Sequence, residues 1–302
     1  MLPQFLHCRW EKILPFLLGK YINVLSYLFP ARAASLGFRI FCYPVRLPIK
    51  AYQKEFFATA RQSVLEHNGE DIKIYKWNNG PRKILFLHGW QSHSFRWKSY
   101  LDSFPADEFT IYSIDAPGHG LSSGSFLTVP LYSEIVEKFI LQHGPVDIVS
   151  HSLGSFTTLY TLHRLPLLPV GKLVLLAPPG EATEFLDFYK RTLNLSDKAV
   201  GLIKDHFESV IDQQVEYFSA PKFAEGLMHS GLIIHDEDDD ETPVHHAVAI
   251  HKVWKRSTLV VTKGLSHNLK SKEIVARVAD FIKGHELTES SKASKSVVEQ
   301  TS

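Results

Sequence analysis

The chain has 302 residues, of which 44% are hydrophobic and 12% aromatic, enough for one large α/β domain with appendages. Its 33 basic and 32 acidic residues nearly cancel, which argues against a nucleic-acid partner bound through phosphate neutralisation. The two cysteines, Cys8 and Cys42, are too few for a disulfide framework. They favour a reducing, cytoplasmic location.

Residues 1–60 are predicted to form an N-terminal helical extension. Its segment 13–29 is mostly apolar, but Pro15, Lys20 and Asn23 interrupt it, and a membrane span needs about 20 predominantly apolar residues. We expect this helix to pack on the rest of the protein. The rival interpretation is peripheral membrane contact, with residues 13–29 lying on a membrane surface.

A hairpin follows the extension. Residues 63–66 and 72–77 have the composition of strands, and Asn68-Gly69 lies between them. Asn-Gly between two extended runs favours a tight hairpin turn.

Short apolar runs then alternate with helical patterns. The runs begin at Lys83, Thr110, Val146, Lys172, Leu232 and Thr258, and the helical patterns cover about 94–104, 130–142, 153–164, 243–254 and 272–283. Nearly continuous hydrophobicity in each run is typical of strands buried on both faces. The alternation predicts a three-layer α/β/α sandwich with a mostly parallel sheet over residues 61–284.

Two segments do not fit that alternation. Residues 181–230, between two of the apolar runs, carry several helical patterns and are predicted to form a helical cap. Residues 285–302 are rich in Ser, Lys and Glu and are predicted to form a disordered tail.

The first candidate for chemistry is Ser152, in the stretch SHSLG of residues 150–154. It falls between a predicted strand and a predicted helix, where a sharp turn exposes a serine. Such a turn needs small neighbours two residues to either side. Gly154 supplies one, and Ser150 stands where the G-x-S-x-G pattern has its first glycine. The alternative is an ordinary loop in which Ser152 caps the helix.

The second candidate is the acidic run of residues 236–241. It begins like a calcium-binding loop, but the positions that need Gly and Glu hold Glu241 and Ala247, so that interpretation fails. A metal site of His235, His245 and His246 has no recognised spacing, and we expect no metal and no cofactor.

Neighbouring carboxylates raise one another's pKa, so six of them cannot all be buried and ionised together. One or two should therefore be buried and the rest solvated. Thr242 and Pro243 have the pattern of a helix N-cap and first residue.

The third candidate is His267, in the loop after the last predicted strand. Serine, acid and histidine therefore follow one another in that order along the chain, each beyond the end of a strand. Ligands bind at this edge of open parallel sheets.

Five motifs in order resemble the α/β-hydrolase family. They are LFLHGW (85–90), DAPGHGLSSG (115–124), SHSLG (150–154), DDETP (239–243) and GLSHN (264–268). The resemblance covers about residues 63–283. Alignment on Pro243 implies Asp239 as the acid, with Asp238 and then Asp236 as the alternatives.

The resemblance implies a serine hydrolase acting on a small-molecule acyl substrate, an ester or thioester. Ser152 is the implied nucleophile, His267 the base and Asp239 its partner. The backbone N–H groups of Trp90 and Leu153 are the implied oxyanion hole.

His88 and His119 are expected to hold loops rather than to react. The cap carries six aromatic residues that suit an acyl pocket or a packed lid: Phe185, Phe188, Tyr189, Phe207, Tyr217 and Phe218.

Two alternatives stay open. One is a non-catalytic binding protein with the same fold, and the other is a membrane-surface lipase or adaptor anchored by the N-terminal helix. Nothing in the sequence indicates an oligomeric state.

Overall fold

The computed structural model describes residues 4–285, with side chains from residue 14 onward, and the chain divides into two compact units. The larger unit is Pro44–Gly180 with the residues from Ala220 on. The smaller unit joins the residues up to Tyr43 to the segment Glu181–Ser219. The predicted tail lies, from residue 286 on, outside the described residues.

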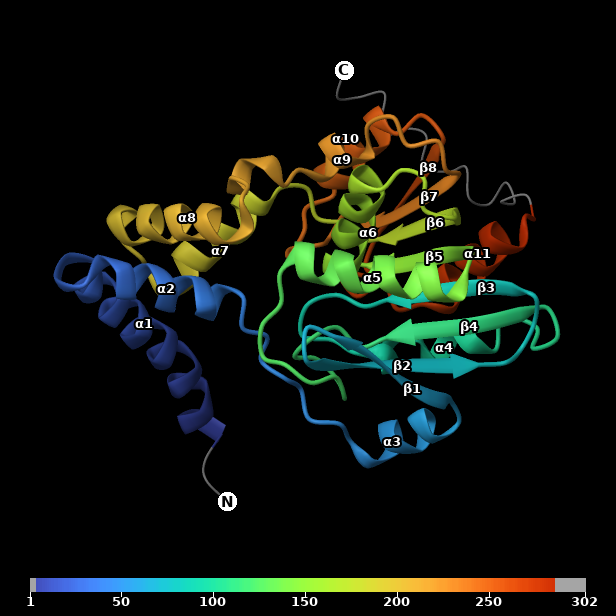
Figure 1. The fold of residues 1–302 in the computed structure, drawn as a ribbon, viewed down its shortest axis with the longest axis horizontal. Coiled ribbons are helices and arrows are strands. Elements are labelled where there is room, and N and C mark those ends of the chain that lie inside the picture. The colour runs from blue at the N-terminus through green and yellow to red at the C-terminus, as the bar shows by residue number, and fades with distance from the viewer. Residues whose placement is uncertain (1–3, 286–302) are drawn as a thin grey trace. The chain divides into compact units, whose positions relative to one another are not determined.

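The larger unit contains an eight-stranded sheet (Figure 1). Its strands are β1 (Arg61–His67), β2 (Glu70–Trp77), β3 (Arg82–Leu87), β4 (Phe109–Ile114), β5 (Val146–His151), β6 (Val170–Leu176), β7 (Gly231–Asp236) and β8 (Ser257–Thr262). The order is β1-β2-β4-β3-β5-β6-β7-β8. Strand β2 pairs antiparallel with β1 and β4, and every other pair is parallel. Each predicted strand is present, and the sheet is mostly parallel as expected.

The predicted hairpin is confirmed. Strands β1 and β2 pair with His67 opposite Glu70. The two turn residues, Asn68 and Gly69, have φ values of 52° and 79°. Asparagine and glycine are the residues that adopt this left-handed conformation most readily.

Helices cover both faces of this sheet. They are α3 (Ala51–Ala58), the 3₁₀ turn η1 (Ser94–Trp97), α4 (Lys98–Leu101), α5 (Val129–His143), α6 (Leu153–Arg164), α9 (Ala220–Ala224), α10 (His245–Val253) and α11 (Lys272–Lys283). In Figure 1, α5 and α6 cover the near face of the sheet, and α4 and α11 lie behind it. The expected three-layer sandwich is therefore present.

One helix begins later than predicted. The sequence pattern put Thr242 and Pro243 at the N-cap and first residue, but α10 begins at His245 with Val244 as its N-cap. The hydroxyl and amide of Thr242 bond instead to the carboxylate of Asp239. A local hydrogen bond to the side chain of Asp239, three residues earlier, has replaced the capping preference of threonine.

The predicted N-terminal extension is shared between the two units. Residues 44–60, with α3, belong to the larger unit because two α3 rings stack on β2. Phe57 lies 4.6 Å from Tyr75 and Phe56 lies 5.2 Å from Trp77, measured between ring centroids. These aromatic contacts bury α3 on the sheet.

The smaller unit packs the N-terminal helix pair, α1 (Gln4–Leu28) and α2 (Pro30–Phe41), against α7 (Ala182–Leu193), α8 (Asp197–Ile211) and the turn η2 (Val215–Tyr217). Gly19 of α1 lies so close to the end of α7 that an added Cβ would be 1.6 Å from the Leu193 carbonyl oxygen. The Asn23 side chain donates to the Asn194 carbonyl at 3.0 Å and accepts from the Ser196 amide at 2.8 Å. One face of α1 therefore packs on the cap segment.

Helix α2 completes this small core. The Tyr189 hydroxyl donates to the Gly37 carbonyl at 2.9 Å. The Phe207 ring packs edge-on against Phe38 and Phe218, at centroid distances of 5.8 and 5.7 Å. Tyr217 also packs on Phe218, at 5.4 Å between centroids, so at least four of the six cap aromatics contribute to packing within the smaller unit.

The cap segment leaves and rejoins the larger unit at one place. The Ala220 amide donates to the Gly180 carbonyl at 2.7 Å, and Glu181 and Ser219 form an antiparallel bridge just beyond. The two ends of the 39-residue segment are therefore clasped together.

Within residues 4–285, no helix combines the length and the apolar character that crossing a bilayer requires.

Candidate active site

Ser152 occupies a sharp turn between β5 and α6. Its φ of 50° and ψ of −120° are strained for a residue with a side chain. A Cβ added to Gly89 would lie 2.9 Å from the Ser152 Cβ, and one added to Gly154 would lie 2.5 Å from the Leu87 carbonyl oxygen. Both glycines are needed for the end of β3 to approach the turn this closely.

Ser150 fits the position where the common pattern has glycine. It is fully buried, and its hydroxyl donates to the Val174 carbonyl of β6 at 3.1 Å. The hydrogen bond satisfies the one polar atom that serine adds to this crowded position.

Asp239 and His267 form a buried pair at the carboxyl ends of β7 and β8. The His267 Nδ1 lies 2.8 Å from Asp239 Oδ2. The Thr242 hydroxyl lies 2.9 Å from the same oxygen and 3.1 Å from His267 Nδ1. The amides of Glu241 and Thr242 donate to Asp239 Oδ1, each at 2.9 Å.

A second histidine supports the same carboxylate. His235, which is fully buried in β7, places Nε2 3.2 Å from Asp239 Oδ2 and 2.5 Å from the Thr242 carbonyl oxygen. Burial raises the pKa of the Asp239 carboxyl, but the hydrogen bonds from His235, His267 and Thr242 outweigh it and hold that pKa well below its ordinary value. Asp239 therefore stays ionised.

The two alternative acids lie elsewhere. Asp236 Oδ1 accepts from the Ser266 amide and its Oδ2 from the Leu265 amide, both at 3.0 Å. Asp238 Oδ2 accepts from the Gly264 amide at 3.1 Å. These two carboxylates hold the backbone that leads to the histidine, whereas Asp239 contacts its ring.

The serine and the histidine are not joined by a hydrogen bond. Within the side chains described, the Ser152 hydroxyl makes none, and His267 Nε2 has the Glu241 carboxylate 3.8 Å away. Catalytic hydrogen bonds are often long in ligand-free enzymes and shorten when substrate binds.

Two backbone amides near Ser152 are open. Leu153 is the first residue of α6, so its N–H has no partner within the helix. The Trp90 amide follows Gly89, which lies against Ser152. In the described part of the chain, neither N–H donates a hydrogen bond.

His88 and His119 hold the loop that carries Trp90. His88 Nδ1 donates to the Gly89 carbonyl at 2.7 Å, and its Nε2 accepts from the Ala116 amide at 3.0 Å. His119 Nε2 accepts from the Gln91 amide at 3.0 Å. Burial lowers the pKa of each ring to about 3, so both are neutral. This agrees with the loop-holding role expected of them.

Asp115 connects strand β2, the turn η1 and the loop at Leu121. Its Oδ2 accepts from the Tyr75 hydroxyl and the Leu121 amide, and its Oδ1 from the Ser94 amide, at 2.8 to 2.9 Å. Gly120 has a φ of 49°, and an added Cβ would lie 2.0 Å from Asp115 Oδ2. Gly120, the second glycine of the segment DAPGHG, therefore makes room for Asp115 of the same segment.

His151 was missed by the sequence analysis. Its Nε2 lies 2.8 Å from the His267 carbonyl oxygen, and the two rings are 4.8 Å apart between centroids. Burial, with a smaller contribution from the positive charge of Arg96, lowers the pKa of His151 well below its ordinary value. The only sequence signal was its place next to Ser152.

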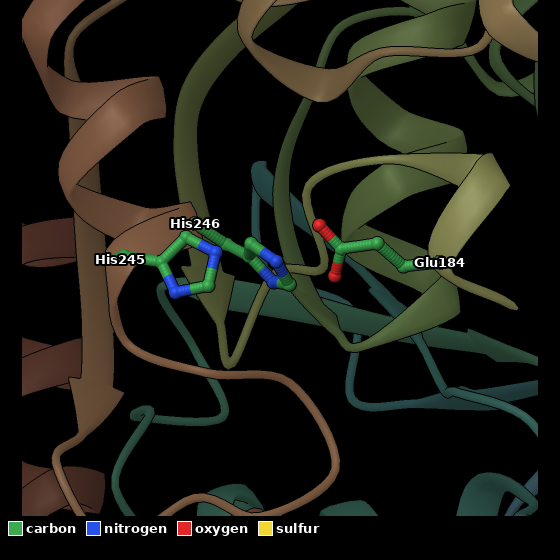
Figure 2. Close-up of side chains that lie close together, drawn as sticks. All are labelled: Glu184, His245 and His246. Atoms are coloured by element: carbon green, nitrogen blue, oxygen red, sulfur yellow. The ribbon is translucent and has the colours of Figure 1, made fainter. Parts of the chain in front are cut away.

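Among the described residues, His235 does not lie in one cluster with the other two histidines considered for a metal site. His235 is bonded to Thr242 and Asp239, as described above. His245 and His246 are neighbours at the start of α10, with ring centroids 4.3 Å apart. Figure 2 draws these two rings and the side chain of Glu184, which belongs to α7 of the other unit.

A mostly parallel sheet with a strained serine after β5 and a paired acid and histidine after β7 and β8 has the architecture of a hydrolase of the α/β class. The chain belongs to the alpha/beta hydrolase family, whose model matches residues 84–275. Membership supports hydrolysis as the general activity.

Individual proteins resemble parts of the chain. A serine hydrolase-like protein of Danio rerio is 36% identical over 90 residues, which are 26% of this chain and 27% of that protein. The chain thus matches about a quarter of the length of that relative.

Solved structures share the fold. They include a serine hydrolase from Cycloclasticus zankles (TM-score 0.59, 18% identity, 74% of this chain and 98% of the other). Another is Est1E from Butyrivibrio proteoclasticus, solved with ferulic acid (TM-score 0.60, 16% identity, 74% and 98%). At these identities the likeness concerns the fold alone.

Proposed function

We propose that the protein is a serine hydrolase that cleaves a carboxylic ester or thioester through an acyl-enzyme intermediate. The observation that carries the proposal is the buried Asp239–His267 hydrogen bond of 2.8 Å at the same sheet edge as the strained Ser152. An ionised acid next to a histidine, with an accessible serine nearby, is the arrangement that acyl transfer requires.

The proposed first step is attack of Ser152 Oγ on the acyl carbonyl carbon. His267 Nε2 takes the hydroxyl proton while Nδ1–H donates to Asp239, whose charge stabilises the imidazolium. His267 then gives the proton to the leaving alcohol or thiol. Water, deprotonated by the same nitrogen, attacks the acyl-enzyme; the acyl–Oγ bond breaks, His267 returns the proton to Ser152 Oγ, and the acid is released.

The amides of Leu153 and Trp90 are the proposed donors to the oxyanion of the tetrahedral intermediate. Both are without a partner among the described residues, and Leu153 opens a 12-residue helix whose dipole favours negative charge at this end. Each such donor lowers the barrier by about 3 to 4 kcal/mol in enzymes that use one.

The test combines labelling with turnover. A fluorophosphonate probe should label the folded protein at Ser152 and leave Ser152→Ala unlabelled. The wild type should hydrolyse members of a series of p-nitrophenyl esters of increasing chain length, with a matched thioester series to identify the preferred leaving group. A folded protein that resists the probe and matches Ser152→Ala on both series would instead be a non-catalytic binding protein.

A further inference from the structure

The exposed face of α1 is apolar along its described length. Eight large hydrophobic side chains of α1 and of Phe29, the residue between α1 and α2, are exposed. Their exposed fractions range from 42% for Phe16 to 66% for Leu14 and Tyr27. They are Leu14, Phe16, Leu17, Tyr21, Val24, Tyr27, Leu28 and Phe29. Five of them, at positions 14, 17, 21, 24 and 28, recur every three or four residues and so form one stripe along the helix. The opposite face, with Gly19, Ile22 and Asn23, packs on the cap segment.

Positive charge borders this apolar stripe. The Lys20 ammonium lies 4.6 Å from the centre of the Phe16 ring, and the Arg32 guanidinium lies 5.3 Å from that of Phe29. Lys198 of α8 lies 4.0 Å from the centre of the Tyr27 ring. Cations beside exposed aromatic rings are typical of segments that lie at a lipid–water interface.

The helix pair carries little compensating negative charge. Residues 4–41, which contain the pair, have five basic residues and one acidic residue, Glu11, whereas the cap segment 181–219 contains eight acidic and four basic ones. The smaller unit is therefore polarised, with a cationic helix pair packed on an acidic cap segment.

Helix α2 adds an open groove with two arginines. The groove has a volume of about 330 Å³ and is lined by Ala31, Arg32, Ser35, Leu36 and Arg39. Two guanidinium groups one turn to either side of a hydroxyl suit the phosphate of a lipid headgroup, because arginine bonds phosphate oxygens in pairs.

We propose that the N-terminal helix pair docks on the surface of a bilayer that contains anionic phospholipid. The apolar stripe of α1 enters the boundary between headgroups and acyl chains, and Lys20, Arg32 and Arg39 contact the phosphates. A second copy of the chain fits this face less well, since each helix pair has five basic residues and only one acidic residue. The proposal is independent of the proposed hydrolase activity.

Vesicle sedimentation tests the proposal with the full chain. The wild type should sediment with vesicles of phosphatidylcholine and phosphatidylglycerol, and far less with phosphatidylcholine alone. The variant Arg32→Gln/Arg39→Gln should bind the anionic vesicles roughly 30-fold more weakly, given the usual effect of a basic residue at such a surface. The matched control Lys252→Gln/Arg256→Gln, at exposed positions of the larger unit, should bind like the wild type.

A second pair of variants tests the apolar stripe. Leu17→Ser/Tyr21→Ser/Val24→Ser/Leu28→Ser should abolish sedimentation with anionic vesicles. The control changes four exposed apolar residues of the larger unit, Val64, Leu141, Leu167 and Met228, to serine and should bind normally. Circular dichroism checks that both variants are folded.

Three results would overturn the proposal: equal binding to neutral and anionic vesicles, equal loss in the stripe variant and its control, or a wild-type dimer in sedimentation velocity that the stripe variant dissociates. The last would show that a second copy covers this face. Ser152→Ala should sediment like the wild type, so a failure of the hydrolase proposal leaves this result readable.

Discussion

His151 donates a hydrogen bond from its side chain to the backbone carbonyl of His267, across 2.8 Å. The residue next to Ser152 therefore holds the loop that carries the histidine. Since burial keeps the His151 ring neutral, Nε2 carries the single proton that this bond needs. The distance between serine and histidine thus depends on a contact between the two turns themselves.

Removal of that contact should slow turnover without weakening substrate binding. For His151→Leu we expect kcat to fall by roughly 10- to 100-fold, because small misplacements of catalytic groups have effects of this size, with KM little changed. His151→Gln keeps an N–H donor and should recover part of the loss. Steady-state kinetics on the best ester checks this, and a rise in KM alone would contradict it.

Changes within the acidic run should separate its members. Asp239→Asn should reduce kcat by about 10⁴-fold, since the amide no longer orients the histidine or stabilises its cation. Asp240, which is exposed, is the matched control, and Asp240→Asn should leave kcat unchanged. Comparable activity in the two variants, or severe loss in Asp238→Asn, would show that Asp239 is not the acid.

The Thr242 hydroxyl should contribute to the same pair. Thr242→Val removes the hydroxyl that lies 2.9 Å from Asp239 Oδ2 but keeps the volume and the backbone amide. One such hydrogen bond contributes about 1 kcal/mol, so kcat should fall about fivefold. Thr242→Ser should behave like the wild type, and a valine variant with normal kcat would assign the hydroxyl to folding alone.

Acid should destabilise the protein before its carboxylates titrate. The folded pKa values of His88 and His119 are lowered to about 3, whereas an unfolded histidine titrates near 6.5. Below about pH 6.5 the unfolded chain therefore binds more protons than the folded one. Each ring should reduce the free energy of unfolding by up to about 1.4 kcal/mol per pH unit as pH falls from about 6 toward 3.

Urea unfolding at pH 7.0, 6.0 and 5.0 measures this loss. A matched variant, His285→Gln, changes an exposed histidine and should keep the same slope. A free energy of unfolding that is constant across this interval would show that the buried rings are protonated in the folded state.

The sheet could be predicted from the sequence because each strand is a local pattern. A buried parallel strand needs an unbroken apolar run, and each run from Lys83 to Thr258 became one. The approach of Asp239 to His267 was also predictable. Their strands, β7 and β8, are adjacent and parallel, so the loops after them meet at one edge.

The composition of the smaller unit could not be predicted in this way. Asn23 contacts Asn194 across 171 positions of the chain, and no periodicity in either segment identifies the other. His151 was missed for a similar reason, since one of 16 histidines carries no pattern. The N-cap expected at Thr242 failed because a buried carboxylate competed for the same hydroxyl.

Because the Ala220 amide bonds to the Gly180 carbonyl, the cap between these residues could be replaced by another segment. This one hydrogen bond already brings the two ends of the cap segment together. Since the cost of closing a loop rises slowly with its length, β6 and β7 can keep their parallel register with a cap of different length between them. A lineage could therefore replace residues 181–219 with a different cap while the turn at Ser152 stays intact. The N-terminal helix pair would have to change with it, because the core of the smaller unit is shared between them.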